Sequence, residues 1–335
     1  MKIHEKYIKR CIEISKNGLV AAMPNPSVGA VIVYNDIIIG EGFTSAYGGN
    51  HAEVNAINSV KNKSLLSKST IYVSLEPCSH FGKTPPCCNL IIENNIPNVV
   101  VGILDSNEKV AGNGIKKLLE AGKNVTVGVL ERECYESNIR FFTFHEKKRP
   151  YIILKWAESQ NGFIAPQMRN EQKPVWITNQ FSRQLVHKWR SEEQSILVGT
   201  QTVIDDNPKL DVRDWSGKNP VRIVLDLNNR ISKESHIFDS QSKTIIISNE
   251  NVNTTNNLAL EIADLLYDKK IQSVIVEGGK QILQTFIDFN LWDEARVFRG
   301  NIFFEDGIKG PIFNKECNSR SVILDDELLI FRNYD

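Results

Sequence analysis

Hydrophobic and polar positions alternate with two different periods along the first 130 residues. Apolar residues recur at helical spacing at Ile8, Cys11 and Ile12, which predicts an opening helix over residues 3–17 that ends at Gly18. The elements predicted after it are a hairpin over residues 30–34 and 37–40, a helix over 51–57, a strand over 70–75, a helix opening at Pro86, a strand over 98–104, a helix ending at Gly122 and a strand over 124–129. Helices that alternate with strands in this way predict a layered α/β domain.

The pattern changes between residues 141 and 151. An aromatic run from Phe141 to Phe144 gives way to a charged stretch that ends at Pro150, and we place a domain boundary there, with domains over residues 1–147 and 148–335. Further strands, with helical stretches between them, are predicted over residues 151–155, 196–199, 221–226, 244–248 and 273–277. The second domain is therefore predicted to be α/β as well.

Composition limits the classes of partner. Of the 335 residues 41% are hydrophobic, which is enough for two buried cores. The 40 basic and 40 acidic residues give a formal net charge of zero. We expect no nucleic-acid partner, because phosphate neutralisation supplies most of that affinity. The apolar runs fall short of the roughly 20 residues of a membrane-spanning helix, and the first residues lack the pattern of a signal peptide. We therefore expect a cytoplasmic protein without membrane association. We also expect it to form a homo-oligomer.

Three of the six cysteines lie between Cys78 and Cys88, which favours metal ligation over a disulfide framework. His51 at the start of a predicted helix, Cys78 after a strand and Cys87 at the start of the next helix supply one imidazole and two thiolates. These residues predict an open zinc site, because catalytic zinc keeps a fourth position for water and lowers the pKa of that water to about 7. Glu53 is expected to shuttle protons beside it, since the His-x-Glu and Pro-Cys pattern is the signature of zinc deaminases.

A closed zinc site that only holds loops together is the alternative, with Cys88 or His80 as the fourth ligand. Such a site has no use for a glutamate two residues from a histidine ligand. Adjacent helical residues point about 100° apart, so Cys88 is expected to be a small buried residue and not a ligand. The remaining cysteines, Cys11, Cys134 and Cys317, are expected to be core thiols, and His4, His145, His187 and His236 are expected to be packed or solvated.

Three motifs of the N-terminal half resemble the family of bifunctional riboflavin biosynthesis deaminase/reductases. They are Pro24-Asn25-Pro26-Ser27-Val28-Gly29, His51-Ala52-Glu53 and the run Glu76-Pro77-Cys78-Ser79-His80-Phe81-Gly82-Lys83-Thr84-Pro85-Pro86-Cys87. Eight residues separate Cys78 from Cys87, whereas cytidine, deoxycytidylate and tRNA adenosine deaminases have Cys-x-x-Cys. The resemblance implies a cytidine-deaminase-like three-layer domain in which Asn25, His80 and Lys83 contact substrate. An ammonium at Lys83 suits the 5′-phosphate of the family's substrate, and a solvated loop lysine is the alternative.

The chemistry that this resemblance implies is the hydrolytic deamination of 2,5-diamino-6-ribosylamino-4(3H)-pyrimidinone 5′-phosphate. His51, Cys78 and Cys87 would hold Zn²⁺. Glu53 would take a proton from water and pass it to the ring nitrogen and then to the leaving ammonia, as a general acid and base.

The C-terminal half gives weaker signals by itself. Its strand over residues 273–277 runs into Gly278-Gly279, which either binds an anion at a helix N-terminus or only closes a tight turn. The resemblance continues, however, through Lys155-x-Ala157-x-Ser159, Trp176-Ile177-Thr178, His187-Lys188-Trp189-Arg190, Thr202-Val203, Asp206-Asn207-Pro208-x-Leu210-x-x-Arg213 and Val276-Glu277-Gly278-Gly279. It implies a dihydrofolate-reductase-like domain that binds NADPH and reduces the ribosyl side chain to ribityl.

The same motifs imply roles for individual residues of that domain. Cofactor contacts fall on Ala157, Trp176, Thr202, Asp206 and Gly279, and substrate contacts on Arg190, Leu210, Arg213 and Glu277. Two arginines from separate elements suit a clamp on the ribose phosphate. Lys155 and Glu277 are both candidates for handling the proton that accompanies hydride transfer. Asn161 stands where the family has Asp, and the tail after Asp293-Glu294 matches less closely.

Two other functions fit the sequence less well. A nucleotide or nucleic-acid base deaminase with a non-catalytic C-terminal domain is disfavoured by the zero net charge and by the spacing of Cys78 and Cys87. A zinc-stabilised binding module that only recognises a pyrimidine would lack a proton shuttle, and Glu53 is present.

Overall fold

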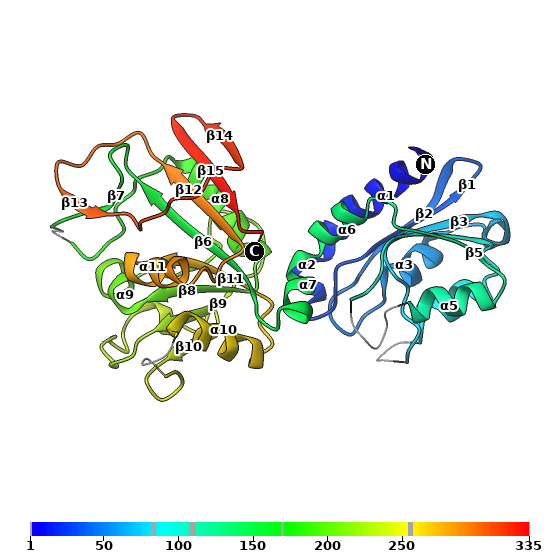
Figure 1. Ribbon diagram of the computed structural model, residues 1–335, viewed down its shortest axis with the longest axis horizontal. Helices are drawn as coiled ribbons and strands as arrows, with labels where there is room; N and C mark the ends of the chain where they lie inside the picture. The colour runs from blue at the N-terminus through cyan, green and yellow to red at the C-terminus, as the bar shows by residue number, and fades with distance from the viewer. Residues whose placement is uncertain (1, 82–84, 107–111, 169–170, 254–256, 335) are drawn as a thin grey trace. The chain divides into compact units, whose positions relative to one another are not determined.

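The computed structural model describes residues 2–81, 85–106, 112–168, 171–253 and 257–334. The chain divides into two compact units, Met1–Lys147 and Lys148–Asp335 (Figure 1). Each unit contains its own large sheet. None of the helices in the described ranges is both long enough and apolar enough to cross a membrane.

The first unit is a five-stranded sheet between two layers of helices. The strand order is β2-β1-β3-β4-β5, with β1 antiparallel to β2 and β3, and with β3, β4 and β5 parallel. Helices α1 and α6 (Glu131–Ser137) cover one face, and α3, α4 and α5 cover the other (Figure 1). The bounds are α1 (Lys2–Ser15), α2 (Leu19–Ala22), β1 (Gly29–Tyr34), β2 (Ile37–Phe43), α3 (Ala52–Ser59), β3 (Thr70–Leu75), α4 (Cys87–Glu93), β4 (Asn98–Ile103), α5 (Asn113–Glu120) and β5 (Asn124–Val127).

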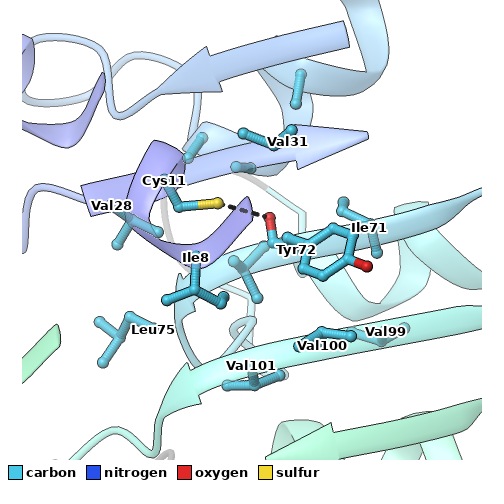
Figure 2. Packing of buried hydrophobic residues seen from close by; sticks show 14 of the residues in the cluster. Ile8, Cys11, Val28, Val31, Ile71, Tyr72, Leu75, Val99, Val100 and Val101 are labelled. Carbon is cyan, nitrogen blue, oxygen red and sulfur yellow. Dashed lines mark hydrogen bonds between the residues drawn. The ribbon is translucent and has the colours of Figure 1, made fainter. Parts of the chain in front are cut away.

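The core of this unit lies between α1 and the sheet. Ile8 and Cys11 lie about one turn apart on α1, and both side chains are fully buried against the strands (Figure 2). The Cys11 thiol donates to the carbonyl oxygen of Tyr72, with 3.3 Å between sulfur and oxygen. Cys11 and Cys134 are therefore core thiols, as the sequence predicts.

The segment after residue 130 continues the first unit as two short helices that the sequence analysis did not predict. They are α6 (Glu131–Ser137) and α7 (Ile139–Glu146). The rings of Tyr135 and Phe142 stack with their centroids 4.6 Å apart, and Phe141 is buried beside them in the same core. The aromatic run thus packs as a helix, and the chain passes to the second unit after it.

The second unit is built on an eight-stranded mixed sheet of order β10-β9-β8-β11-β6-β12-β15-β14. The first six strands in this order, β10, β9, β8, β11, β6 and β12, are parallel to one another. Strand β15 is antiparallel to β12 and to β14, which forms the edge of the sheet. The strand bounds are β6 (Tyr151–Glu158), β8 (Ser195–Gly199), β9 (Val221–Leu225), β10 (Thr244–Ile247), β11 (Ser273–Gly278), β12 (Glu294–Arg299), β14 (Ser319–Ile323) and β15 (Asp326–Arg332), with β7 (Phe163–Pro166) and β13 (Gly307–Lys309) in a separate pair. The helices are α8 (Gln180–Glu192), α9 (Thr200–Asp206), α10 (Leu258–Asp268) and α11 (Lys280–Asp288).

The two faces of this sheet carry different chemistry. Leu154, Trp156 and Val276 point into the core that α10 and α11 cover. Successive side chains of a strand point to opposite faces, so Lys155 and Glu277 point to the other face, where α8 lies. A pair of ionisable groups is thereby placed beside α8.

One cysteine in the segment after β12 is exposed, although the sequence analysis expected it to be buried. Cys317, which the sequence analysis expected in a core, is exposed just before the edge strand β14. Its sulfur lies 3.1 Å from the carbonyl oxygen of Ser319. An edge strand leaves its flanking residues in solvent, which explains the difference.

Candidate active sites

The three candidate metal ligands of the first unit lie together. His51 is the residue before α3, Cys78 follows β3 and Cys87 is the first residue of α4. Their ligand atoms all lie within 4.8 Å of one another, and His51 Nδ1 is 3.5 Å from the Cys78 sulfur and 3.3 Å from the Cys87 sulfur. One imidazole and two thiols at this spacing fit a zinc ion with a fourth position left for water.

Glu53 is the second residue of α3, two positions after His51, and its side chain is buried. Burial, reinforced by the negative charge of Cys78, raises the pKa of Glu53 to about 7. The hydrogen bond from Cys87 and the neighbouring His51 lower the pKa of Cys78, which favours its thiolate form. A buried glutamate with a pKa near neutrality is suited to accept and return a proton.

Glu76 fixes the segment that carries Cys78. Its buried carboxylate accepts hydrogen bonds from backbone N–H groups at the start of α5, with Gly114 N at 2.8 Å, Gly112 N at 3.0 Å and Ile115 N at 3.3 Å. The first N–H groups of a helix have no partner within the helix, and a carboxylate there also meets the positive end of the helix dipole. Glu76 therefore attaches the end of β3 to α5, two residues before Cys78.

Cys88 is turned away from the candidate metal site. Its sulfur lies 3.2 Å from the carbonyl oxygen of Pro77 and 3.5 Å from that of Gly114, and its side chain is fully buried. His80 is exposed and is not part of the group formed by His51, Cys78 and Cys87. The described residues thus support the open three-ligand arrangement over a closed one with Cys88 or His80.

Asn25 and His80, which are expected to contact the substrate in this unit, lie in the segments before β1 and after Cys78. Asn25 is half-buried in the turn before β1, and its backbone N–H donates to the Ala22 carbonyl at 2.9 Å. His80 projects from the surface of the loop that follows Cys78. Lys83 lies outside the described residues.

The second unit contains a cavity of about 820 Å³ at the carboxyl ends of β6, β8, β9 and β11. Ligands of open α/β sheets bind at this end of parallel strands. Most of the residues expected to contact cofactor or substrate line the cavity, namely Lys155, Ala157, Trp176, Arg190, Thr202, Asp206, Arg213, Glu277 and Gly279.

Leu210 is different from the other expected contacts. Its side chain is buried in a small core with Val198 and Ile237, and it is not among the residues that line the cavity. The backbone of Leu210 has a positive φ of 53°, which turns the chain toward the segment with Asp211 and Arg213. A direct side-chain contact between Leu210 and a ligand in the cavity is therefore not supported.

Arg190 and Glu277 form the electrostatic centre of the cavity. Arg190 donates from Nε to Glu277 Oε1 at 3.0 Å and from a terminal nitrogen to Oε2 at 2.7 Å, and both side chains are largely buried. Burial alone would raise the pKa of Glu277, but the positive charges of Arg190 and Lys155 outweigh it and hold that pKa at about 2. Burial lowers the pKa of Lys155 despite the neighbouring carboxylate.

The glycine turn after β11 borders the same cavity. Gly279 precedes α11, and a Cβ atom added there would lie 3.4 Å from Thr202 Oγ1. Gly199 ends the neighbouring strand β8, and a Cβ atom added at Gly199 would lie 3.9 Å from the backbone nitrogen of Gly279. Two adjacent turns without side chains leave room for a phosphate group at the N-terminus of α11.

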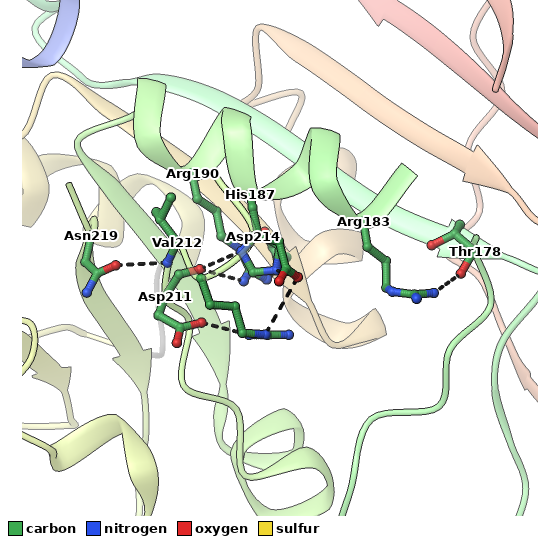
Figure 3. Close-up of polar contacts among 10 residues, drawn as sticks. Thr178, Arg183, His187, Arg190, Asp211, Val212, Asp214 and Asn219 are labelled. Atoms are coloured by element: carbon green, nitrogen blue, oxygen red, sulfur yellow. Dashed lines mark hydrogen bonds and ion pairs between the residues drawn. The ribbon is translucent and has the colours of Figure 1, made fainter. Parts of the chain in front are cut away.

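Three residues of the cavity were missed by the sequence analysis as functional candidates. Arg183 and His187 lie one turn apart on α8, and with Arg190 they form one face of the helix (Figure 3). Arg183 also stacks over Trp176, 4.7 Å from the ring centroid. Arg230, in the segment that follows β9, also lines the cavity. The i, i+4, i+7 spacing on α8 was a signal that could have identified the first two.

Asn161 has a local structural role. Its amide donates to the Phe304 carbonyl at 2.7 Å and accepts from the Ser159 hydroxyl at 2.8 Å. An aspartate could accept from Ser159 but could not donate to Phe304. Asn161 does not line the cavity, so its difference from the family pattern lies in a turn.

Comparison with known proteins assigns both units to characterised families. Residues 1–103 match the model of the cytidine and deoxycytidylate deaminase zinc-binding region, and residues 150–316 match the model of the RibD C-terminal domain. The riboflavin biosynthesis protein RibD of Aquifex aeolicus is 37% identical over 89% of this chain and 86% of its own length. The protein of the same name from Chlamydia pneumoniae is also 37% identical, over 90% of this chain and 85% of its own.

Solved structures give the same result. A diaminohydroxyphosphoribosylaminopyrimidine deaminase/5-amino-6-(5-phosphoribosylamino)uracil reductase from Thermotoga maritima has a TM-score of 0.89 and 36% sequence identity, with 99% of each chain covered. RibD of Acinetobacter baumannii has a TM-score of 0.86 and 28% identity over 99% of each chain. The predicted cytidine-deaminase-like and dihydrofolate-reductase-like folds are thereby confirmed.

Because both halves match, the alternative of a base deaminase with a non-catalytic C-terminal domain is set aside. The first unit supplies a zinc-binding deaminase domain, and the second supplies a reductase domain whose chemistry requires a nicotinamide cofactor. The chain belongs to the RibD family of bifunctional deaminase/reductases of riboflavin biosynthesis.

Proposed function

We propose that the first unit deaminates 2,5-diamino-6-ribosylamino-4(3H)-pyrimidinone 5′-phosphate and that the second reduces the ribosyl side chain of the product with NADPH. The observation that carries the first half is the group of His51, Cys78 and Cys87 within 4.8 Å, with the buried carboxyl group of Glu53 beside it. The donor set of one imidazole and two thiolates suits zinc. Bound there, zinc would lower the pKa of water so that hydroxide is available at neutral pH.

Glu53 carries the proton in this deamination. With a pKa raised by burial to about 7, its carboxylate takes a proton from water and its carboxylic acid returns that proton to the ring nitrogen. The oxygen of that water bonds to the ring carbon, and Glu53 then takes its second proton and delivers it to the amine, so that the C–N bond breaks and ammonia departs. Asn25, His80 and Lys83 are proposed to hold the substrate, with the Lys83 ammonium on the 5′-phosphate.

In the second unit, the cavity and the two glycine turns support a site for NADPH, which when bound supplies a hydride. Ala157, Trp176, Thr202, Asp206 and Gly279 are proposed to contact it. Arg230 lines the same cavity, and its guanidinium favours NADPH over NADH because the additional 2′-phosphate carries negative charge.

Lys155 is the proposed proton donor for the reduction. The Glu277 carboxylate accepts two hydrogen bonds from Arg190 and has a pKa of about 2, so it carries no proton near neutral pH. Lys155 has its pKa lowered by burial, so its ammonium gives up a proton more readily. Arg213 and Arg190 are proposed to recognise the substrate, with Arg213 the more accessible of the two.

The setting of these reactions is proposed from the sequence. A zero net charge is consistent with small-molecule substrates and with no nucleic-acid partner. We propose a cytoplasmic homo-oligomer on the basis of the composition and the family resemblance.

Two assays on the same purified proteins test the proposed deamination and the proposed reduction. The aminopyrimidine phosphate is supplied with and without NADPH, and ammonia release and NADPH oxidation are measured on the parent and on Glu53→Gln. We expect the variant to keep zinc, to lose deamination by about 100-fold or more and to oxidise NADPH normally when given the deaminated product. Deamination by Glu53→Gln at the parent rate would refute the role of Glu53, and a parent that never oxidises NADPH would refute the second half.

A further inference from the structure

His187 links α8 to the chain segment of residues 211–214, which borders the cavity. The His187 side chain is 4% exposed, its Nδ1 lies 2.9 Å from the carbonyl oxygen of Asp211 and its Nε2 lies 3.2 Å from Asp214 Oδ2 (Figure 3). Arg190, three residues further along α8, donates to the same Asp211 carbonyl at 3.2 Å. One histidine thus holds both ends of a four-residue segment.

The segment held in this way carries a cavity residue. Arg213 lies between the two acidic residues and donates to Asp211 Oδ1 at 2.7 Å, and its side chain is 44% exposed. Elsewhere the segment is tied by Val212 N, which donates to Asn219 Oδ1 at 2.9 Å. The direction of the Arg213 guanidinium therefore depends on the acidic neighbours that His187 fixes.

The chemistry of the two contacts differs. A carbonyl oxygen can only accept, so Nδ1 of His187 carries a hydrogen in either protonation state. Nε2 faces a carboxylate, so it donates a hydrogen bond only when the ring is an imidazolium. Charged groups face the ring from three elements: Arg190 on α8, Arg213 and Asp214 on the segment, and Glu277 at the end of β11.

We propose that His187 is a positioning residue that determines how strongly the reductase site binds the phosphate of its substrate. It does so by holding residues 211–214 so that Arg213 points into the cavity. This inference rests on the proposed function, in which Arg213 contacts the phosphorylated substrate. His187 itself needs no contact with substrate or cofactor.

The test compares full-length variants in NADPH-dependent reduction of 5-amino-6-(5-phosphoribosylamino)uracil and of its dephosphorylated analogue. His187→Leu removes both contacts, and His187→Asn keeps a donor near the position of Nδ1 but loses the contact to Asp214. His236→Asn is the matched control, because His236 is exposed and its Nδ1 lies 2.9 Å from the Asn207 carbonyl oxygen, away from the cavity lining. Tryptophan emission checks folding, since all five tryptophans belong to the second unit.

At a pH low enough for the His187 ring of the parent to be an imidazolium, we expect His187→Leu to raise the KM for the phosphorylated substrate about tenfold, the scale of one weakened charge-assisted contact. The kcat value, the KM for the dephosphorylated analogue and the affinity for NADPH are expected to stay within about threefold of the parent. His187→Asn is expected to fall between the parent and His187→Leu, and the His236 control is expected to match the parent. Equal increases in KM for both substrates, or no increase for either, would overturn the proposal.

Arg213→Ala, measured in parallel, separates this inference from the proposed function. If Arg213→Ala leaves the KM for the phosphorylated substrate unchanged, the substrate role of Arg213 is wrong and the inference falls with it. If Arg213→Ala raises that KM and His187→Leu does not, the inference alone is wrong.

A pH profile gives a readout that a merely structural role would not change. The imidazolium holds Asp214 and adds a positive charge, so phosphate binding in the parent is expected to weaken as the pH rises through the pKa of His187. Burial places that pKa below its ordinary value. The substrate phosphate titrates in the same range, with a pKa near 6, so the profile is taken as the ratio of KM in His187→Asn to KM in the parent. We expect this ratio to fall toward one with rising pH, and a ratio independent of pH would contradict the proposal.

Discussion

The guanidinium of Arg190 meets the carboxylate of Glu277 through two parallel hydrogen bonds of 3.0 and 2.7 Å. Paired hydrogen bonds of this kind fix orientation as well as charge. The pair joins α8 to the end of β11 across one side of the cavity, so it contributes to the fold of the second unit and to the shape of its site. Lys155 adds a second positive charge to the same carboxylate.

This arrangement predicts an acid-labile second unit. The pKa of Glu277 falls from an ordinary value of 4.5 to about 2 on folding, so its contribution to stability is complete above the ordinary value and is lost as the pH falls toward 2. We expect the free energy of unfolding of the parent to exceed that of Glu277→Gln at pH 6 and the difference to shrink by pH 3. Denaturant titrations followed by tryptophan emission measure it for this unit. A difference that is the same at both pH values would contradict the ionised pair.

Gly279 is predicted to be essential for cofactor binding. The backbone there has a φ of −71°, so a side chain is conformationally allowed, and an aspartate would place a negative charge next to Thr202 in the cavity. We expect Gly279→Asp to lower the affinity for NADPH by at least about tenfold through repulsion of the pyrophosphate, while ammonia release continues at the parent rate. Calorimetric titration with NADPH measures the effect, and Gly279→Ala separates bulk from charge. Unchanged NADPH binding by the aspartate variant would show that the glycines only form a turn.

Arg230 is predicted to discriminate between the two nicotinamide cofactors. Its removal deletes a cation from the cavity lining, so Arg230→Ala is expected to weaken NADPH binding by about tenfold to 100-fold and to leave NADH binding unchanged. Lys233→Ala is the control, since Lys233 is an exposed cation three residues away and is not among the cavity residues. Equal losses for the two cofactors would exclude a role for Arg230 at the 2′-phosphate.

Adjacent cysteines give a matched test of the zinc site. The Cys87 sulfur lies 3.3 Å from His51 Nδ1, whereas the Cys88 sulfur faces the carbonyl oxygens of Pro77 and Gly114. We expect Cys87→Ala to lose zinc after dialysis and Cys88→Ala to retain close to one ion per chain. Metal analysis of the two proteins decides the matter. Zinc loss from both variants would point to a general disruption of α4 instead of to ligation.

The local pattern in the first unit was strong enough to predict how its candidate ligands come together. His51 and Cys87 lie at the starts of helices, and Cys78 lies three residues after the end of β3. Each candidate ligand therefore lies next to a helix or strand whose hydrophobic pattern could be recognised in the sequence. The anchoring role of Glu76 was not predicted, because its partners at Gly112 and Gly114 lie more than 30 residues further along the chain. Contacts over that separation depend on tertiary packing, which periodicity does not report.

The second unit was harder to predict. Strand β12 carries three charged residues, Glu294, Arg296 and Arg299, and such a segment does not have the sequence pattern of an interior strand. Arg296 is nevertheless buried, with its guanidinium 4.6 Å from the ring centroid of Trp189. Leu210 was expected at the ligand from its motif, but its side chain fills a small core. His187 was expected to be an ordinary packed histidine, and the acidic segment that it contacts is more than 20 residues away in sequence.

The position of β15 in the sheet has a consequence for biosynthesis. Among the described residues this strand, Asp326–Arg332, comes last in sequence and lies between β12 and β14, whereas the described strands of the first unit fall within residues 29–127. A domain forms as a unit once its residues are available, so the first unit can form during translation. The second cannot complete its sheet until residues 326–332 have left the ribosome. A nascent chain therefore carries a complete deaminase fold before it carries a complete reductase fold, and a stop codon before residue 326 would remove β15 from the second sheet and leave the strands of the first unit intact.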